Sequence, residues 1–172
     1  MMFRPDPETV PPFYKAYVEL VKEMDLLEAL QYAGTLVQEI VKTVPEGKGE
    51  FRYEQGKWSI KELLNHMMDA ERIFAYRALR FSRNDQTPLH AFEENDYAPR
   101  ANAHSRTVTQ LGTEMHRLRV TTVDLYNSFS NDMLALEGTA SSKRLSVFNL
   151  GYIIAGHDIH HRNVLLERYL RQ

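Results

Sequence analysis

Apolar residues recur at helical spacing along four long segments of the chain. In the first segment, residues 25–43, the apolar positions are Leu26, Leu27, Leu30, Ala33, Leu36, Val37 and Ile40. Further helices are predicted at about 59–82, 107–131 and 146–170. Four long helices with short connectors predict an all-α fold, a four-helix bundle.

Capping motifs support the predicted helix starts. Ser59 is followed three residues later by Glu62, and Thr107 by Gln110, which is the pattern of a capping box. Ser146 is the expected cap of the last helix.

Strand signals are weak. Extended backbone is indicated only at residues 51–53, and a turn is expected around Gly138 and Thr139. The chain shows no repeats and no second domain, so residues 1–172 are interpreted as one domain.

Two segments lie outside the bundle pattern. Residues 1–22 are predicted as a proline-rich extended arm followed by a short helix from Pro12 to about Lys22. Residues 83–106 form a long loop between the second and third bundle helices. A loop of this length in a compact domain is usually functional or mobile.

Composition excludes several classes of function. The 172 residues carry 21 Lys and Arg against 23 Asp and Glu, a formal charge of -2, which gives no electrostatic basis for binding nucleic acid or anionic membranes. No 18-residue apolar run and no signal-peptide pattern are present, so a soluble, cytoplasmic protein is expected.

The chain contains no cysteine, which excludes disulfides, thiolate metal sites and a cysteine nucleophile. Any transition metal must therefore be bound by histidine and carboxylate. The positions of the seven histidines consequently decide the chemistry that this chain can support.

Two histidines fall in the apolar stripe of the last helix. The stripe consists of Val147, Leu150, Ile154, His157, His161 and Val164. His157 and His161 are four residues apart, so one helix face can present both imidazoles to one metal ion.

The helix at 59–82 repeats this pattern, because His66 lies in its apolar stripe with Leu63, Ala70 and Ile73. Inward stripes of neighbouring helices face each other, so His66 can meet the pair. Three imidazoles with the remaining coordination positions open form a catalytic type of metal site.

Two alternatives stay open. A histidine on an apolar face is often a core residue satisfied by hydrogen bonds. His160 competes with His161, since it is also one turn from His157, but His161 continues the stripe. The remaining histidines are interpreted as structural or surface residues: His90, His104 and His116.

Residues 57–81 (KWSIKELLNHMMDAERIFAYRALRF) and 146–170 (SVFNLGYIIAGHDIHHRNVLLERYL) resemble the DinB/YfiT-like superfamily of metal-dependent enzymes. The order of motifs also matches, and the resemblance covers the chain from about residue 20. It implies a four-helix bundle in which His66, His157 and His161 hold a divalent metal, nickel or zinc.

The resemblance further implies transfer of a low-molecular-weight thiol to an electrophilic small molecule, an S-transferase-like activity. A metal-dependent hydrolase is the alternative within the same class. A non-catalytic bundle that binds a small ligand or dimerises is the alternative of another class. Relatives are often dimers, which implies a homodimer with the N-terminal arm as a candidate contact.

Three acidic residues are candidates around the metal. Asp69, one turn from His66, could orient an imidazole or act catalytically, or could be a solvated surface acid. Glu71 could be a general base, or could pair with Arg72 or Arg77. Asp158 adjoins His157 but is interpreted first as a solvated surface acid.

Aromatic and small residues give the remaining candidates. Phe92 and Tyr97 in the long loop could bind substrate, or could simply pin the loop to the bundle. Trp58 is interpreted as a core anchor. Gly156 permits close helix approach directly before His157.

Overall fold

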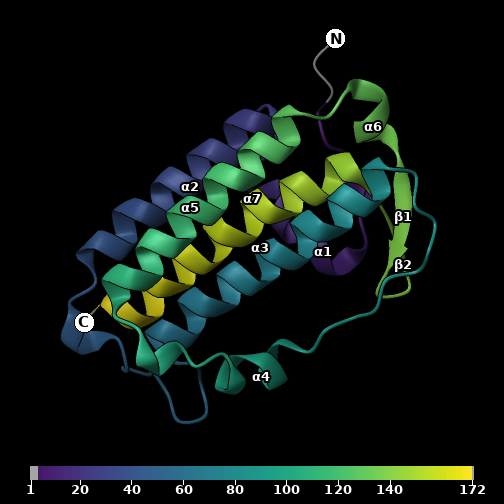
Figure 1. Cartoon of the computed structure of the whole chain (residues 1–172). Helices are drawn as coiled ribbons and strands as arrows, with labels where there is room; N and C mark the ends of the chain where they lie inside the picture. Colours follow the sequence, from purple (N-terminus) through teal and green to yellow (C-terminus); the bar gives the residue numbers. More distant parts are fainter. Residues whose placement is uncertain (1–3, 172) are drawn as a thin grey trace.

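The computed structural model describes residues 4–171, and four long helices dominate it (Figure 1). These are α2 (Leu26–Thr43), α3 (Ile60–Ser82), α5 (Val108–Asn127) and α7 (Val147–Val164). They form the predicted four-helix bundle.

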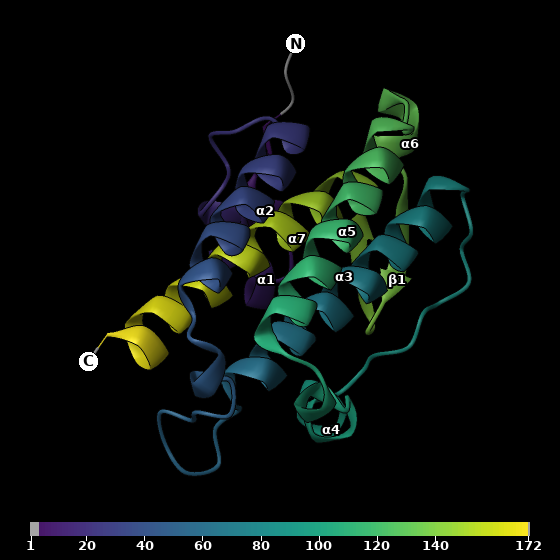
Figure 2. The same ribbon diagram turned by 60° about the vertical axis from the view of Figure 1, so that its left-hand side comes forward.

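Helices that follow each other in sequence are not always neighbours in the bundle. α7 packs against both α2 and α3, and α5 packs against the same two helices from the other side (Figure 2). α2 and α3 therefore lie diagonally, joined by residues 44–59, which include the 3-10 helix η2 (Glu46–Lys48). This arrangement places the inward face of α3 directly against α7.

The predicted caps are confirmed. Ser59 Oγ accepts a hydrogen bond from Glu62 N at 3.2 Å, and the Glu62 carboxylate accepts one from Ser59 N at 2.7 Å. Thr107 and Gln110 make the equivalent reciprocal pair at the start of α5. Ser146 Oγ caps α7 by accepting from Asn149 N at 3.0 Å.

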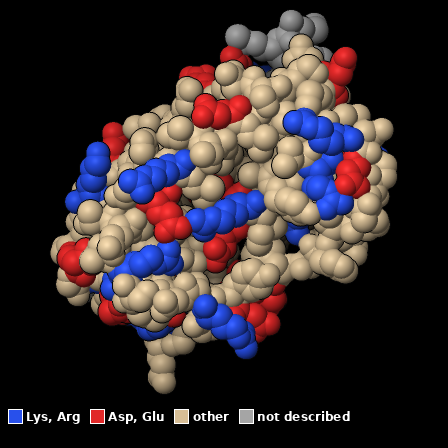
Figure 3. Space-filling view, viewed as in Figure 1, with Lys and Arg blue, Asp and Glu red and all other residues tan. Residues whose placement is uncertain are grey.

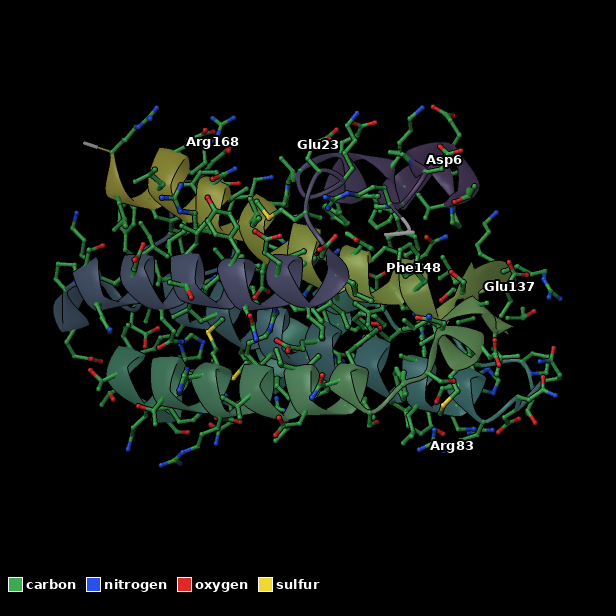
Figure 4. The ribbon with its side chains drawn as sticks, turned by 90° about the horizontal axis from the view of Figure 1, so that it is seen from above. Asp6, Glu23, Arg83, Glu137, Phe148 and Arg168 are labelled. Carbon is green, nitrogen blue, oxygen red and sulfur yellow. The ribbon has the colours of Figure 1, made fainter. Side chains whose placement is uncertain are left out.

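α7 is the central helix of the bundle. The sequence predicts one inward stripe, but almost every residue from Val147 to Ile159 is buried, whichever direction it faces. α2, α3 and α1 (Pro12–Glu19) all pack against it. Seen from above, it runs from Phe148 toward Arg168, which lies in the terminal π-helical segment η5 (Leu165–Leu170) (Figure 4).

The N-terminal segment is folded onto α7. Residues 1–3 of the predicted arm lie outside the described residues, and Pro7–Thr9 form a 3-10 helix, η1, instead of extended chain. α1 ends at Glu19, three residues earlier than predicted.

A β-hairpin replaces the turn that was predicted at Gly138 and Thr139. Both residues lie inside β1 (Glu137–Ala140), which pairs antiparallel with β2 (Lys143–Ser146). The turn falls at Ser141 and Ser142, whose φ angles of 51° and 62° fit a two-residue hairpin turn. Residues 51–53, which carry a weak sequence signal for extended backbone, form no strand.

The third bundle helix is also shorter than predicted. α5 ends at Asn127, and a separate helix, α6 (Asn131–Ala135), leads into the hairpin.

The predicted long loop at residues 83–106 is confirmed. It holds three short helices: α4 (Glu94–Tyr97), η3 (Ala98–Arg100) and η4 (Ala103–Ser105). Its first half is fixed to the hairpin, because Leu89 N donates to Thr139 O and Leu89 O accepts from Ser141 N.

On the face seen in Figure 3, basic and acidic side chains are interspersed without a patch of one sign. Among the described residues, no helix combines the length and apolarity that spanning a bilayer requires.

Candidate metal centre

α3 and α7 bring the three predicted histidines together. His66 Nε2 and His157 Nε2 face each other at 3.1 Å, and the rings of His157 and His161 are 4.4 Å apart between centroids. One nitrogen from each of the three residues lies within 4.8 Å of the others. His160 is not part of this group, and its ring packs beside the rings of Tyr17 and His161.

Burial keeps the three imidazoles neutral. Loss of solvent lowers the pKa of His66 to about 4. Burial also holds the pKa of His157 and His161 well below the usual range, and their mutual repulsion adds to the effect. Neutral imidazole is the form that binds metal ions, so the site is ready for a metal at pH 7.

The donor geometry fits a divalent ion. Two imidazole nitrogens bound at 2.0–2.1 Å to one tetrahedral ion stand roughly 3.3 Å apart, close to the observed separation of His66 and His157. Nδ1 of His161 is buried without a hydrogen-bond partner in the described part of the chain. An unsatisfied imidazole beside two neutral ones fits a metal site better than a hydrogen-bonded core.

Aromatic side chains surround the cluster. The ring of Trp58 lies 4.6 Å from that of His66, so this residue, predicted as a core anchor, also packs on a candidate ligand. Tyr17 of α1 stands edge-on to His157 at 5.4 Å, and Phe74 lies 6.3 Å from the same ring. These walls exclude water from the inner side of the site.

The surface is reached at the His161 end, where His160 and His161 are partly exposed. Two hollows elsewhere, of about 670 Å³ between α2 and α5 and about 820 Å³ beside α6 and the hairpin, are not lined by the three histidines.

The carboxylate predicted to orient His66 does not do so. Asp69 accepts a hydrogen bond from Asn65 Nδ2 at 2.7 Å and pairs with Arg72, and burial raises its pKa. Within residues 4–171, no carboxylate hydrogen-bonds to any of the three imidazoles. The Asp69 carboxylate is bound by Asn65 and Arg72 instead.

Glu71 and Asp158 belong to a buried ion network around an arginine that sequence reasoning missed. Arg119 of α5 donates to both Glu71 oxygens at 2.9 and 3.0 Å, to Asp158 Oδ2 at 2.7 Å and to Leu30 O at 2.9 Å. The predicted partners of Glu71, Arg72 and Arg77, are therefore wrong. Asp158 is not a surface acid, since it is 4% exposed.

A sequence signal for Arg119 existed. It occupies the inward stripe of α5 together with Met115, Thr122 and Tyr126, at the same spacing of three and four residues. A lone arginine on such a stripe calls for a buried carboxylate partner.

The two loop candidates lie away from the imidazoles. Phe92 packs against the core and lies 5.5 Å from the ring of Tyr97, which is 47% exposed. Neither ring packs against the three histidines, and a role of these two residues in substrate binding stays a prediction.

Comparisons with known proteins agree with this architecture. The chain superposes on YfiT from Bacillus subtilis, described as a probable metal-dependent hydrolase with an unusual four-helix bundle topology. The TM-score is 0.73 at 12% identity, over 96% of this chain and 90% of that one. No curated protein matches the sequence. The sequence profile of the DinB superfamily matches residues 29–165, which include all three histidines. The chain therefore belongs to the DinB superfamily.

Proposed function

We propose that this protein is an enzyme that holds one divalent metal ion, nickel or zinc, on His66, His157 and His161. The observation that carries the proposal is the convergence of three neutral imidazoles, two buried and one partly exposed, and His161 has a ring nitrogen without a hydrogen-bond partner in the described part of the chain. A bound divalent ion would lower the pKa of a coordinated thiol or water and polarise a carbonyl group.

The reaction that fits best is transfer of a low-molecular-weight thiol to an electrophilic small molecule. Metal-dependent hydrolysis generally uses a carboxylate that takes the proton from water, and the described carboxylates do not contact the imidazoles. Asp69 is held by Asn65 and Arg72, and Glu71 by Arg119. A thiol, with an ordinary pKa of about 8.5, would lose its proton on the ion more readily than water, whose ordinary pKa of about 15.7 the ion must lower much further.

Hydrolysis is the second candidate, and the description of YfiT favours it. A non-catalytic ligand-binding bundle is the third. The two reactions differ in one readout, because transfer requires added thiol and incorporates it into the product.

Elemental analysis of untagged protein, wild type and His66→Ala, tests the metal site. We expect close to one ion per chain in the wild type and its loss in the variant. Trp58, the single tryptophan, lies against His66, so added nickel or cobalt should quench its fluorescence in the wild type alone. A wild-type protein that neither contains nor takes up metal would leave only the non-catalytic bundle.

The metal-loaded protein is then assayed on electrophiles with and without a low-molecular-weight thiol. Product that contains the thiol supports transfer. Turnover that is indifferent to thiol concentration supports hydrolysis instead.

A further inference from the structure

Arg77 is a buried cation without a carboxylate partner among the described residues. The residue is only 2% exposed, and no Asp or Glu within residues 4–171 lies at ion-pair distance from it. The other buried arginine, Arg119, is paired with two carboxylates. A buried charge that lacks an opposite charge is costly, so an unpaired guanidinium at this position calls for a counter-ion.

The guanidinium is anchored from one side by neutral acceptors. Nη2 donates to His90 O at 2.9 Å and to Ser141 Oγ at 3.1 Å. Both acceptors belong to the junction where the long loop is hydrogen-bonded to the hairpin. These two bonds use both Nη2 hydrogens and hold the side chain in place, so only Nη1 and Nε remain for the Tyr14 hydroxyl and for a further acceptor.

The other side of Arg77 is aromatic. Its guanidinium carbon lies 5.6 Å from the ring centroid of Phe74 and 6.0 Å from that of Phe92. The Tyr14 hydroxyl also faces the guanidinium. Burial raises the pKa of Tyr14, and the positive charge of Arg77 opposes this rise.

These aromatic residues connect Arg77 to the metal centre. Phe74 contacts Arg77 on one side and the ring of His157 on the other. Tyr14 packs on Phe74 at 5.9 Å and on Tyr17 at 6.4 Å, and Tyr17 stands against His157. The ring of Phe74 therefore bridges the buried guanidinium of Arg77 and the candidate metal ligand His157.

We propose that Arg77 binds the carboxylate of a substrate or cosubstrate whose other end reaches the three histidines. The ligand class is a small monocarboxylate with an apolar middle that lies along Tyr14, Tyr17 and Phe74. This inference rests on the proposed metal site and specifies what that site accepts. Arg77 is a substrate-binding residue in this role.

A carboxylate fits better than a phosphate. Both Nη2 hydrogens are used by His90 O and Ser141 Oγ, so a carboxylate would accept from Nη1 or Nε, one charge against one charge. Glu94 of α4 is close enough to contribute to the raised pKa of Tyr14 and Tyr17, after burial as the main cause. A dianion would meet the negative charge of Glu94 with only one arginine to balance it.

The test compares acids with matched amides on the metal-loaded protein. Calorimetric affinities are measured for 6-mercaptohexanoate and 6-mercaptohexanamide, and for the shorter pair 3-mercaptopropanoate and 3-mercaptopropanamide. For at least one pair we expect the acid to bind roughly tenfold tighter or more, as a charged hydrogen bond warrants. Equal affinities of acid and amide in both pairs would overturn the proposal.

Variants of Arg77 test whether the preference for the acid over the amide depends on this residue. Arg77→Gln should abolish the acid preference, and Arg77→Lys should retain part of it. Arg80→Gln, one turn away and paired with Asp85, is the control that keeps the full ratio. Because each ratio compares two ligands on one protein, it does not depend on stability. A preference unchanged in both Arg77 variants would also overturn the proposal, and the wild-type ratio decides alone if neither folds.

Failure of the metal site gives a different result. If the protein holds no metal, the thiol amides lose their binding as well, and the proposed function fails together with this inference. If metal and amide bind while the acid gains nothing, only the role of Arg77 fails.

Discussion

A Cβ atom at Gly156 would lie 2.0 Å from the carbonyl oxygen of Tyr17. The glycine therefore allows α1 to pack against α7 at the residue before His157. The Tyr17 ring, edge-on to His157, then packs on the three-histidine cluster from a part of the chain outside the family match at 29–165.

Gly156→Ala should destabilise the protein by about 1–3 kcal/mol, because backbone cannot move aside as a flexible side chain can. Urea unfolding measures the change. Gly47→Ala is the matched control, since nothing lies within 4 Å of a Cβ there, and it should stay within about 0.5 kcal/mol of wild type. Equal stability of the two variants would show that α1 does not pack as described.

His161→Ala should lose the bound metal while the bundle stays folded, whereas His160→Ala should retain it. The reason is geometric, because His161 contributes a nitrogen to the three-histidine group and His160 does not. Elemental analysis and circular dichroism measure the two properties. Retention of metal by His161→Ala with loss in His160→Ala would reverse the ligand assignment.

The metal-free protein should lose stability as the pH falls from about 6.5 toward 4. His66 has a pKa of about 4 in the folded state against an ordinary value of 6.5, so only the unfolded chain binds the proton in this window. The contribution is on the order of 3 kcal/mol. Chemical unfolding of chelator-treated protein at several pH values measures it.

The metal-free His66→Gln variant should lose less stability than the wild type between about pH 6.5 and 4. Asp158 acts in the opposite direction, because burial raises its pKa, and its effect cancels in the comparison of the two proteins. Parallel pH profiles would contradict the burial of a neutral His66.

Arg119→Met should cost about 3–5 kcal/mol, because it leaves the carboxylates of Glu71 and Asp158 buried without a cation. The triple variant Glu71→Gln, Arg119→Met, Asp158→Asn should recover much of this loss, since it removes the charges as well. Urea unfolding of the two variants distinguishes them. A triple variant less stable than Arg119→Met would mean that the network contributes net stability beyond charge balance.

Local patterns predicted the bundle helices and the three clustered histidines correctly. Caps such as Ser59 with Glu62 depend on residues three apart, and the pairing of His157 with His161 depends on one helical turn. The hairpin was missed because Glu137–Ala140 and Lys143–Ser146 are short and its turn residues are two serines, which carry no strong turn signal.

The sequence by itself determined which side chains can share a helix face, because helical periodicity is a local property of the chain. It placed His66, His157 and His161 on inward stripes and left no cysteine to compete for a metal. Only the tertiary structure decided which charges meet. The diagonal placement of α2 and α3 brings α5 against the core, so that Arg119 reaches Glu71 and Asp158 and leaves Arg77 without a carboxylate. Ion pairing over 39 or 48 residues depends on how the helices pack, and no local pattern encodes it.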